Sequence, residues 1–120
     1  MRKLVLALLA CFVPLAHASD EVIERFNYVM ADEQRREQAS LAGQERAVFC
    51  VYCHGETGNS KRKHIPNLAG QNPQYLFHSF EKFASGERVD FVMSKLAQNL
   101  SMEERVNIAV FFSQQKVNPP

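Results

Sequence analysis

Cys50 and Cys53 are separated by two residues and are followed at once by His54. In an exported protein, two cysteines this close can form a local disulfide, supply half of a metal site, or attach a haem covalently. Each use requires a different kind of fold around the segment. Export signals, further ligands and secondary structure in the rest of the sequence therefore distinguish the three uses.

The first residues are typical of an export signal. An apolar run over residues 4–15 follows Arg2 and Lys3 and ends in a small-residue motif, Ala16-His17-Ala18. We expect a signal peptide over residues 1–18, cleaved before Ser19. The run is too short for a membrane span, and nothing further along has about 18 consecutive apolar residues. The mature chain is therefore expected to be soluble and periplasmic.

Cys11 offers a second reading of the leader, because Leu8-Leu9-Ala10-Cys11 resembles a bacterial lipoprotein box. A lipid-anchored form would begin at Cys11. The apolar run continues past this residue to the small-residue motif, and this favours cleavage after residue 18. Cys50 and Cys53 then remain as the only cysteines of the mature chain.

The predicted mature chain, residues 19–120, is small for a domain with an independent core. A core of this size is marginal unless a disulfide, a metal or a cofactor supplements it. Its 12 basic and 13 acidic residues nearly balance, and they form no basic stripe. This composition argues against nucleic acid as the partner.

The first half of the mature chain is expected to be helical. Apolar residues at one-face spacing predict an amphipathic helix over residues 20–30. The polar residues 31–38 are either a solvated continuation of that helix or a linker. Ser40 is an acceptable N-cap, so a second helix is predicted from Leu41 to Cys53.

Loop signals separate this helix from the next one. Glycines and Pro66 interrupt residues 55–70, which are expected to be loop. A third helix begins at Pro73, with Asn72 as its cap, and Gly86 ends it.

The last helix has the strongest start signal, a capping box formed by Ser101 and Glu104. We expect this helix to run to about Lys116. No convincing strand pattern is present. The predicted fold class is therefore all-α, a small domain with long loops.

These helical surroundings favour haem over the other uses of the two cysteines. Cysteines at this spacing can form thioethers with the two vinyl groups of haem, and the adjacent His54 can bind iron through Nε2. A thiol–disulfide oxidoreductase would place the motif at a helix start in a strand-rich fold. A structural zinc site needs two more ligands, and no second cysteine pair exists. We predict one covalently bound haem c, attached to Cys50 and Cys53.

Together with these motifs, the sequence resembles the class I c-type cytochromes. It is similar to the small bacterial members, like each half of the two-haem periplasmic cytochromes c. The similarity covers about residues 43–116 and rests on an ordered set: Gly43-Gln44-Glu45-Arg46, Cys50 to His54, Gly55 with Gly58-Asn59-Ser60, Ile65-Pro66-Asn67-Leu68-Ala69-Gly70-Gln71, Tyr75-Leu76, Phe83, Gly86, Met93 and Leu100-Ser101.

The resemblance implies helices wrapped around one haem in residues 42–120, preceded by an N-terminal helical extension over residues 19–41. It also implies that the Gly43 helix crosses the last helix near Phe111, where a glycine lets two backbones approach closely. On the proximal side, it implies a hydrogen bond from Nδ1 of the iron-binding histidine to the backbone carbonyl of Pro66.

The same resemblance implies Met93 as the distal iron ligand, because Met93 matches the position of the family's axial methionine. Met30 and Met102 are expected to pack or to face solvent. His64 and His78 leave a bis-histidine site open as the alternative. A thioether ligand would give a higher reduction potential than a second imidazole.

Iron held by two protein ligands has no open position for a substrate, so the implied function is single-electron transfer between respiratory redox partners and not enzymatic catalysis. The alternative is a dedicated electron-relay subunit of a larger dehydrogenase or oxidoreductase complex, which would use the extension for binding. A haem-based ligand sensor is a third possibility. Lys61-Arg62-Lys63-His64 is the one compact basic cluster, and it is either a docking site for an acidic partner or solvated surface.

Overall fold

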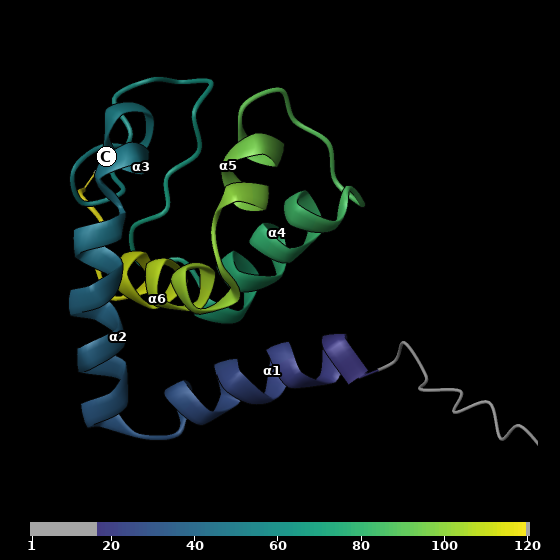
Figure 1. Ribbon diagram of the computed structural model, residues 1–120. Coiled ribbons are helices and arrows are strands. Elements are labelled where there is room, and N and C mark those ends of the chain that lie inside the picture. Colours follow the sequence, from purple (N-terminus) through teal and green to yellow (C-terminus); the bar gives the residue numbers. More distant parts are fainter. Residues whose placement is uncertain (1–16, 120) are drawn as a thin grey trace, which may run out of the picture.

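The computed structural model describes residues 17–119, and all regular secondary structure in that range is helical (Figure 1). The helices are α1 (His17–Met30), α2 (Glu33–Arg46), α3 (Val48–His54), α4 (Pro73–Ser85), α5 (Met93–Asn99) and α6 (Met102–Ser113). The all-α prediction is therefore confirmed. Cys11 and nearly all of the predicted signal peptide lie outside the described residues, while α1 includes His17 and Ala18. None of these helices combines the length and apolar character needed to cross a membrane.

The second helix begins earlier than predicted. Asp32 is its N-cap, and its side chain accepts a hydrogen bond from the backbone N–H of Arg35 at 2.9 Å. The predicted start after Ser40 is wrong, because Ser40 lies inside α2. Only Ala39 and Gly43 are buried along α2, so no apolar stripe marks its first two turns in the sequence.

The predicted continuous helix from Leu41 to Cys53 is divided into two. α2 ends at Arg46, and α3 starts at Val48 after the fully buried Ala47. The backbone N–H groups of Cys50 and Val51 both donate to the carbonyl of Ala47, at 2.8 and 3.2 Å. The break directs α3 away from the axis of α2 (Figure 1).

Gly43 is the point at which α2 crosses α6, as expected. A Cβ atom built there would overlap the backbone carbonyl of Asn107, lying 2.6 Å from its carbon, and would lie 2.9 Å from Cβ of Phe111. Only a residue without a side chain permits this approach. The crossing fixes the direction in which α2 leads into α3.

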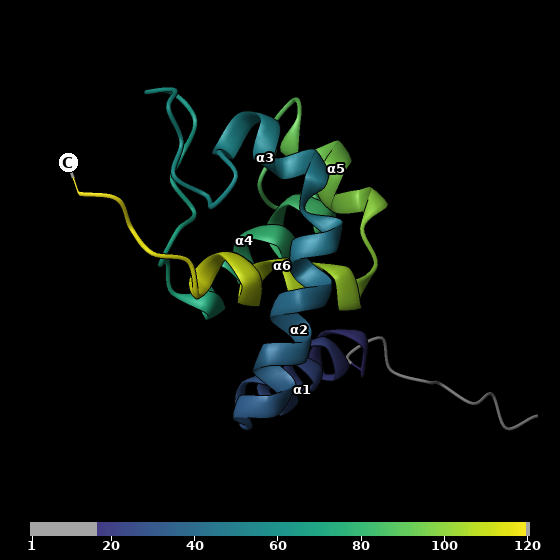
Figure 2. The same cartoon turned by 90° about the vertical axis from the view of Figure 1, so that its left-hand side faces the viewer.

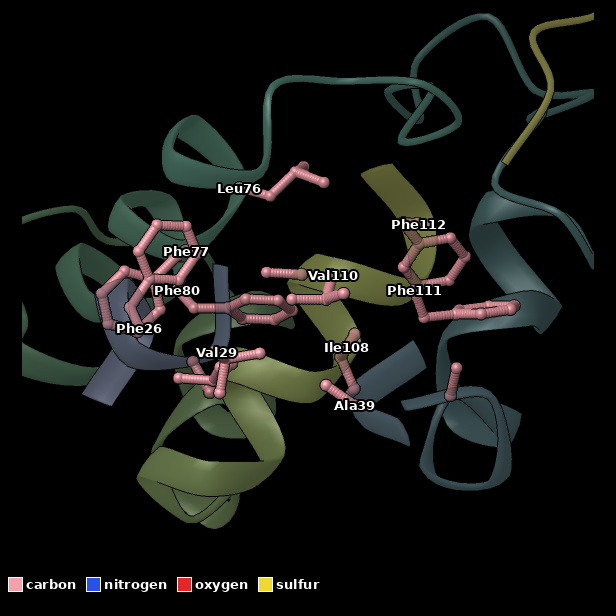
Figure 3. Close-up of a cluster of buried hydrophobic side chains, with 14 of the residues drawn as sticks. Phe26, Val29, Ala39, Leu76, Phe77, Phe80, Ile108, Val110, Phe111 and Phe112 are labelled. Carbon is pink, nitrogen blue, oxygen red and sulfur yellow. The ribbon is translucent and has the colours of Figure 1, made fainter. Parts of the chain in front are cut away.

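α6 forms the centre of the core, which gathers side chains from α1, α2 and α4 around it (Figure 3). Val106, Ile108, Ala109 and Val110 are fully buried. Phe26 of α1 stacks on Phe77 of α4 with ring centroids 4.8 Å apart. The predicted extension, residues 19–41, therefore packs on the core of the domain, and its boundary at residue 41 falls within α2.

Three consecutive residues at the start of α6 are each held by another helix. Glu103 accepts two hydrogen bonds from Arg25 of α1, at 2.6 and 2.7 Å. Glu104 accepts one from Arg46 of α2 at 2.6 Å, and Arg105 pairs with Glu81 of α4. Glu104 also completes the predicted capping box with Ser101. α6 ends at Ser113, three residues before the predicted Lys116.

The third helix follows the prediction closely, whereas the segment after it does not. Asn72 caps α4 by accepting from the N–H of Tyr75 at 3.0 Å, and Gly86 ends the helix in a left-handed conformation with φ of 82°. No helix was predicted between Gly86 and the last helix, but the structure has the two-turn helix α5 there, beginning at Met93.

Candidate haem site

α3 carries Cys50, Cys53 and His54 as its third, sixth and seventh residues. Cys50 is half-buried and packs against the core, and Cys53 is also half-buried. Both are free thiols. His54 closes the helix with only 8 % of its surface exposed, and Tyr52, between the cysteines, is largely exposed. The segment therefore holds its two sulfur atoms available for a covalent bond.

The loop after α3 returns to hold the histidine ring. Nδ1 of His54 lies 2.8 Å from the carbonyl oxygen of Pro66. The carbonyl of Gly58 braces this loop by accepting from the N–H groups of Leu68 and Ala69, at 2.8 and 3.1 Å. Because a carbonyl can only accept, the short contact places the proton on Nδ1 and leaves Nε2 as the nitrogen with a free lone pair.

The environment of the thiols does not suit redox catalysis by the cysteines themselves. Burial raises the pKa of the Cys50 thiol, although the nearby Arg46 opposes this shift. Reactive thiols in dithiol oxidoreductases have lowered pKa values and lie at helix N-termini. Cys50 does lie in the first turn of α3, but its pKa is raised and not lowered, and Cys53 is the sixth of the seven residues of this helix. Across residues 17–119, no group of three or more His, Cys, Asp or Glu side chains is arranged to bind a metal ion.

Met93 begins α5 and packs half-buried against the core. The carboxylate of Asp90 holds this helix start, because its Oδ1 accepts from the N–H groups of Val92 at 2.9 Å and Met93 at 2.7 Å. Ser94 Oγ in turn accepts from the N–H of Asp90 at 2.9 Å. Sequence reasoning missed Asp90 and Ser94; their spacing from Met93 is the signal that would have identified them.

The other candidate ligands lie in surroundings that agree with their expected packing or solvent roles. Met30 is half-buried against the core, and Met102 is half-buried in the first turn of α6. His64 is exposed in the loop after α3. His78 is exposed on α4, where its ring lies 5.9 Å from that of Phe77.

The donor set fits haem c. Two free thiols stand at the spacing that thioether attachment requires, and the adjacent imidazole has one nitrogen engaged by Pro66 and the other available for iron. Nδ1 donation to a carbonyl is a common support for an iron- or zinc-binding histidine. The set lacks the third and fourth ligands that a closed zinc site would need.

Comparison with known proteins gives the same result. No family model matches the chain. The cytochrome c4 of Pseudomonas aeruginosa is 38% identical over 79 residues, which cover 66% of this chain and 39% of that protein. Cytochrome c-554(548) of Halomonas halodenitrificans is 36% identical over 80 residues, covering 64% of this chain and 96% of that protein. The cytochrome subunit of sulfide dehydrogenase from Chlorobaculum tepidum is 34% identical over 70 residues, covering 58% and 63%.

The chain spans about two fifths of the length of the cytochromes c4 that it matches, but nearly all of cytochrome c-554(548). That second match aligns it with a whole protein of one domain's size. The helical fold, the attachment segment and the supported histidine agree with this similarity. The chain belongs to the class I c-type cytochromes, the proteins that carry covalently bound haem c.

Proposed function

We propose that this protein is a mono-haem carrier of single electrons, with haem attached to Cys50 and Cys53. His54 is the proximal iron ligand and Met93 the distal one. The observation that carries the proposal is the 2.8 Å contact between His54 Nδ1 and the carbonyl of Pro66. It holds Nδ1 of an imidazole next to Cys53 in the chain and leaves Nε2 available to bind iron.

The residues around the site limit the movement of the two proposed iron ligands. Pro66 fixes the tautomer and the orientation of His54, and Asp90 fixes the backbone at Met93. Bound haem would supply a reversible one-electron change at its iron. Ligands held on braced backbone rearrange little when the charge at iron changes, and a small rearrangement suits fast outer-sphere transfer. Two protein ligands also leave no vacant position for a substrate.

Attachment of haem c outside the cytoplasm agrees with the export signal predicted over residues 1–18. We therefore place the carrier in the periplasm, between an electron donor and an electron acceptor protein.

The test is spectroelectrochemistry of the exported holoprotein, produced in a host that has a haem-attachment system. The proposal expects one reversible wave of one electron per chain and no carbon monoxide binding to the reduced form. Met93→Ala should abolish the weak far-red sulfur-to-iron band of the oxidised protein, and Met102→Ala is its matched control. Carbon monoxide binding by the unmodified protein, or a far-red band that survives in Met93→Ala, would contradict the proposal.

A second candidate function is an electron-relay subunit of a larger complex. One similar protein is named as the cytochrome subunit of sulfide dehydrogenase, and another, from Thiomonas intermedia, is named as an electron acceptor of thiosulfate dehydrogenase. Size-exclusion chromatography of native extract, compared with the purified chain, separates the two functions. A free carrier elutes at the same volume in both, whereas a subunit elutes earlier in the extract.

A further inference from the structure

Some basic side chains of this protein form ion pairs with its own carboxylates and others do not. Five basic side chains form ion pairs with carboxylates: Arg25, Arg35, Arg46, Lys82 and Arg105. Lys61, Arg62 and Lys63 form none within the described residues, and all three are exposed. With the exposed His64 they make up what we call the basic loop, residues 61–64. Its positive charge is not neutralised by the protein's own carboxylates.

The basic loop is held in place. Arg62 N–H donates to Ser60 Oγ at 3.1 Å, and the N–H of Ile65 donates to the Arg62 carbonyl at 3.0 Å. Asn67 Oδ1 accepts from the N–H of Ser60 at 2.7 Å and thereby closes the base of the loop. A partner that binds a braced loop loses less conformational entropy than one that must order a flexible segment.

The loop also lies beside the haem-attachment segment. The guanidinium of Arg62 stands over the ring of Tyr52 at 5.0 Å from its centroid, and Tyr52 lies between the two cysteines. The carbonyl of Cys53 accepts from Ser60 Oγ at 3.4 Å. A protein seated on the basic loop is therefore close to the site of electron exchange.

Charge is segregated along the chain. Residues 19–45 contain seven acidic and three basic residues, whereas residues 46–120 contain nine basic and six acidic ones. In both views α1 lies at the opposite end of the molecule from α3 and the loop that follows it (Figures 1 and 2). α1 itself carries three acidic residues and one basic residue, and residues 61–63 are all basic, so an acidic helix and the basic loop lie at opposite ends of the molecule (Figures 1 and 2). Such a distribution orients an approaching charged partner before contact.

Resting on the proposed electron-carrier function, we propose that the basic loop is the docking surface for an acidic face of a redox partner protein. Charge complementarity selects this partner, because three consecutive cations without an ion pair lie beside the attachment segment while the acidic α1 end repels acidic surfaces. This uneven distribution of charge turns the attachment segment towards the partner and α1 away from it. The expected effect is on association rate and its salt dependence.

Ferricyanide, a small anionic oxidant, tests the local charge at the site of electron exchange. One electron leaves the reduced protein and converts ferricyanide to ferrocyanide. Residues 19–120 carry 13 acidic and 12 basic residues, so the whole molecule would repel the anion and its rate would rise with salt. Docking at the basic loop requires the opposite, a rate that falls as ionic strength rises.

The variant K61Q/R62Q/K63Q lowers the net charge by three, and E21Q/E24Q/E37Q raises it by three at exposed carboxylates of α1 and α2, away from the loop. At low salt, the loop variant should react at least about threefold more slowly than wild type. This gap should close near 1 M salt, where the Debye length is about 3 Å. Equal and opposite effects of the two variants would show control by net charge and would overturn the proposal.

Direct binding gives a readout independent of redox activity. Poly-L-glutamate should shift the backbone amide NMR signals of residues 60–65 of the reduced holoprotein, and the loop variant should lose this response. Loop-dependent binding to phosphatidylglycerol vesicles without binding to poly-L-glutamate would assign the surface to membranes and overturn the proposal. In each variant, the reduced spectrum and the oxidised spectrum should match those of wild type. If wild type shows no reversible redox change, the electron-carrier function itself fails.

Discussion

The substitution Gly43→Ala tests the crossing that sets the direction of α2 and hence of α3. The added Cβ would lie 2.6 Å from the carbonyl carbon of Asn107 and 2.9 Å from Cβ of Phe111. Carbon atoms pack at about 3.5–4.0 Å, so α2 and α6 must separate by roughly 1 Å. The atoms that are struck belong to the backbone and to a Cβ, so no rotamer change relieves the overlap.

The net effect follows from two opposing contributions to the free energy of unfolding. Overpacking of this kind costs about 1–3 kcal/mol, and backbone contacts place this site at the upper end. Alanine in place of glycine in a helix returns about 1 kcal/mol. The expected net loss is about 2 kcal/mol, which lowers Tm of a domain this size by roughly 8–16 °C.

Thermal unfolding of the holoprotein, followed by circular dichroism, measures this shift. Gln44→Ala is the matched control, because Gln44 is exposed on the same helix and its substitution should change stability by less than about 0.5 kcal/mol. If Gly43→Ala melts within 2 °C of the control, with about 1 °C taken as the error on each Tm, the close approach of α2 and α6 is refuted.

Three further predictions concern α1 and the start of α5. Arg25→Gln should reduce stability at neutral pH by up to about 1 kcal/mol, since the ion pair is partly exposed. The Arg25 hydrogen bond lowers the pKa of the Glu103 carboxyl below its ordinary 4.5, so this contribution is complete above pH 4.5 and disappears as pH falls through the lowered pKa. In denaturant titrations, the variant should be less stable than wild type at pH 7, and this difference should shrink at pH 3. A difference that is the same at both pH values refutes the assignment. Phe26→Ala should cost roughly 3 kcal/mol and speed hydrogen exchange in α1, because its ring stacks within the core; unchanged exchange would show that α1 is not anchored there. Asp90→Ala should weaken the far-red band attributed to Met93 while leaving the attachment of haem intact, whereas an unaltered band would mean that the carboxylate does not position this residue.

The sequence predicted those parts of the fold that have a local chemical signature. The capping box of α6, the Asn72 cap and the Gly86 stop were placed correctly, since each depends on residues adjacent in the chain. α2 was placed too late because it packs through Ala39 and Gly43 and has no apolar stripe. A polar helix of this kind is stabilised by tertiary contacts, which sequence periodicity does not report.

The site could be predicted only where one segment contains it. Cys50, Cys53 and His54 are contiguous and carry their own chemistry, and the resemblance supplied the contact of His54 with Pro66, which the structure contains. Asp90 was missed because its role depends on the start of α5, a helix too short to show periodicity. Met93 was named by resemblance, and its ligand role stays a proposal.

The central claim is covalent attachment of one haem through Cys50 and Cys53, and intact-mass spectrometry under denaturing conditions tests it most directly. The protein should be produced where haem attachment operates, with Cys50→Ser/Cys53→Ser as the control. We expect a chain heavier than its matured polypeptide by the mass of one haem, and no such addition in the control. A fully exported wild-type chain at its polypeptide mass alone would contradict the account.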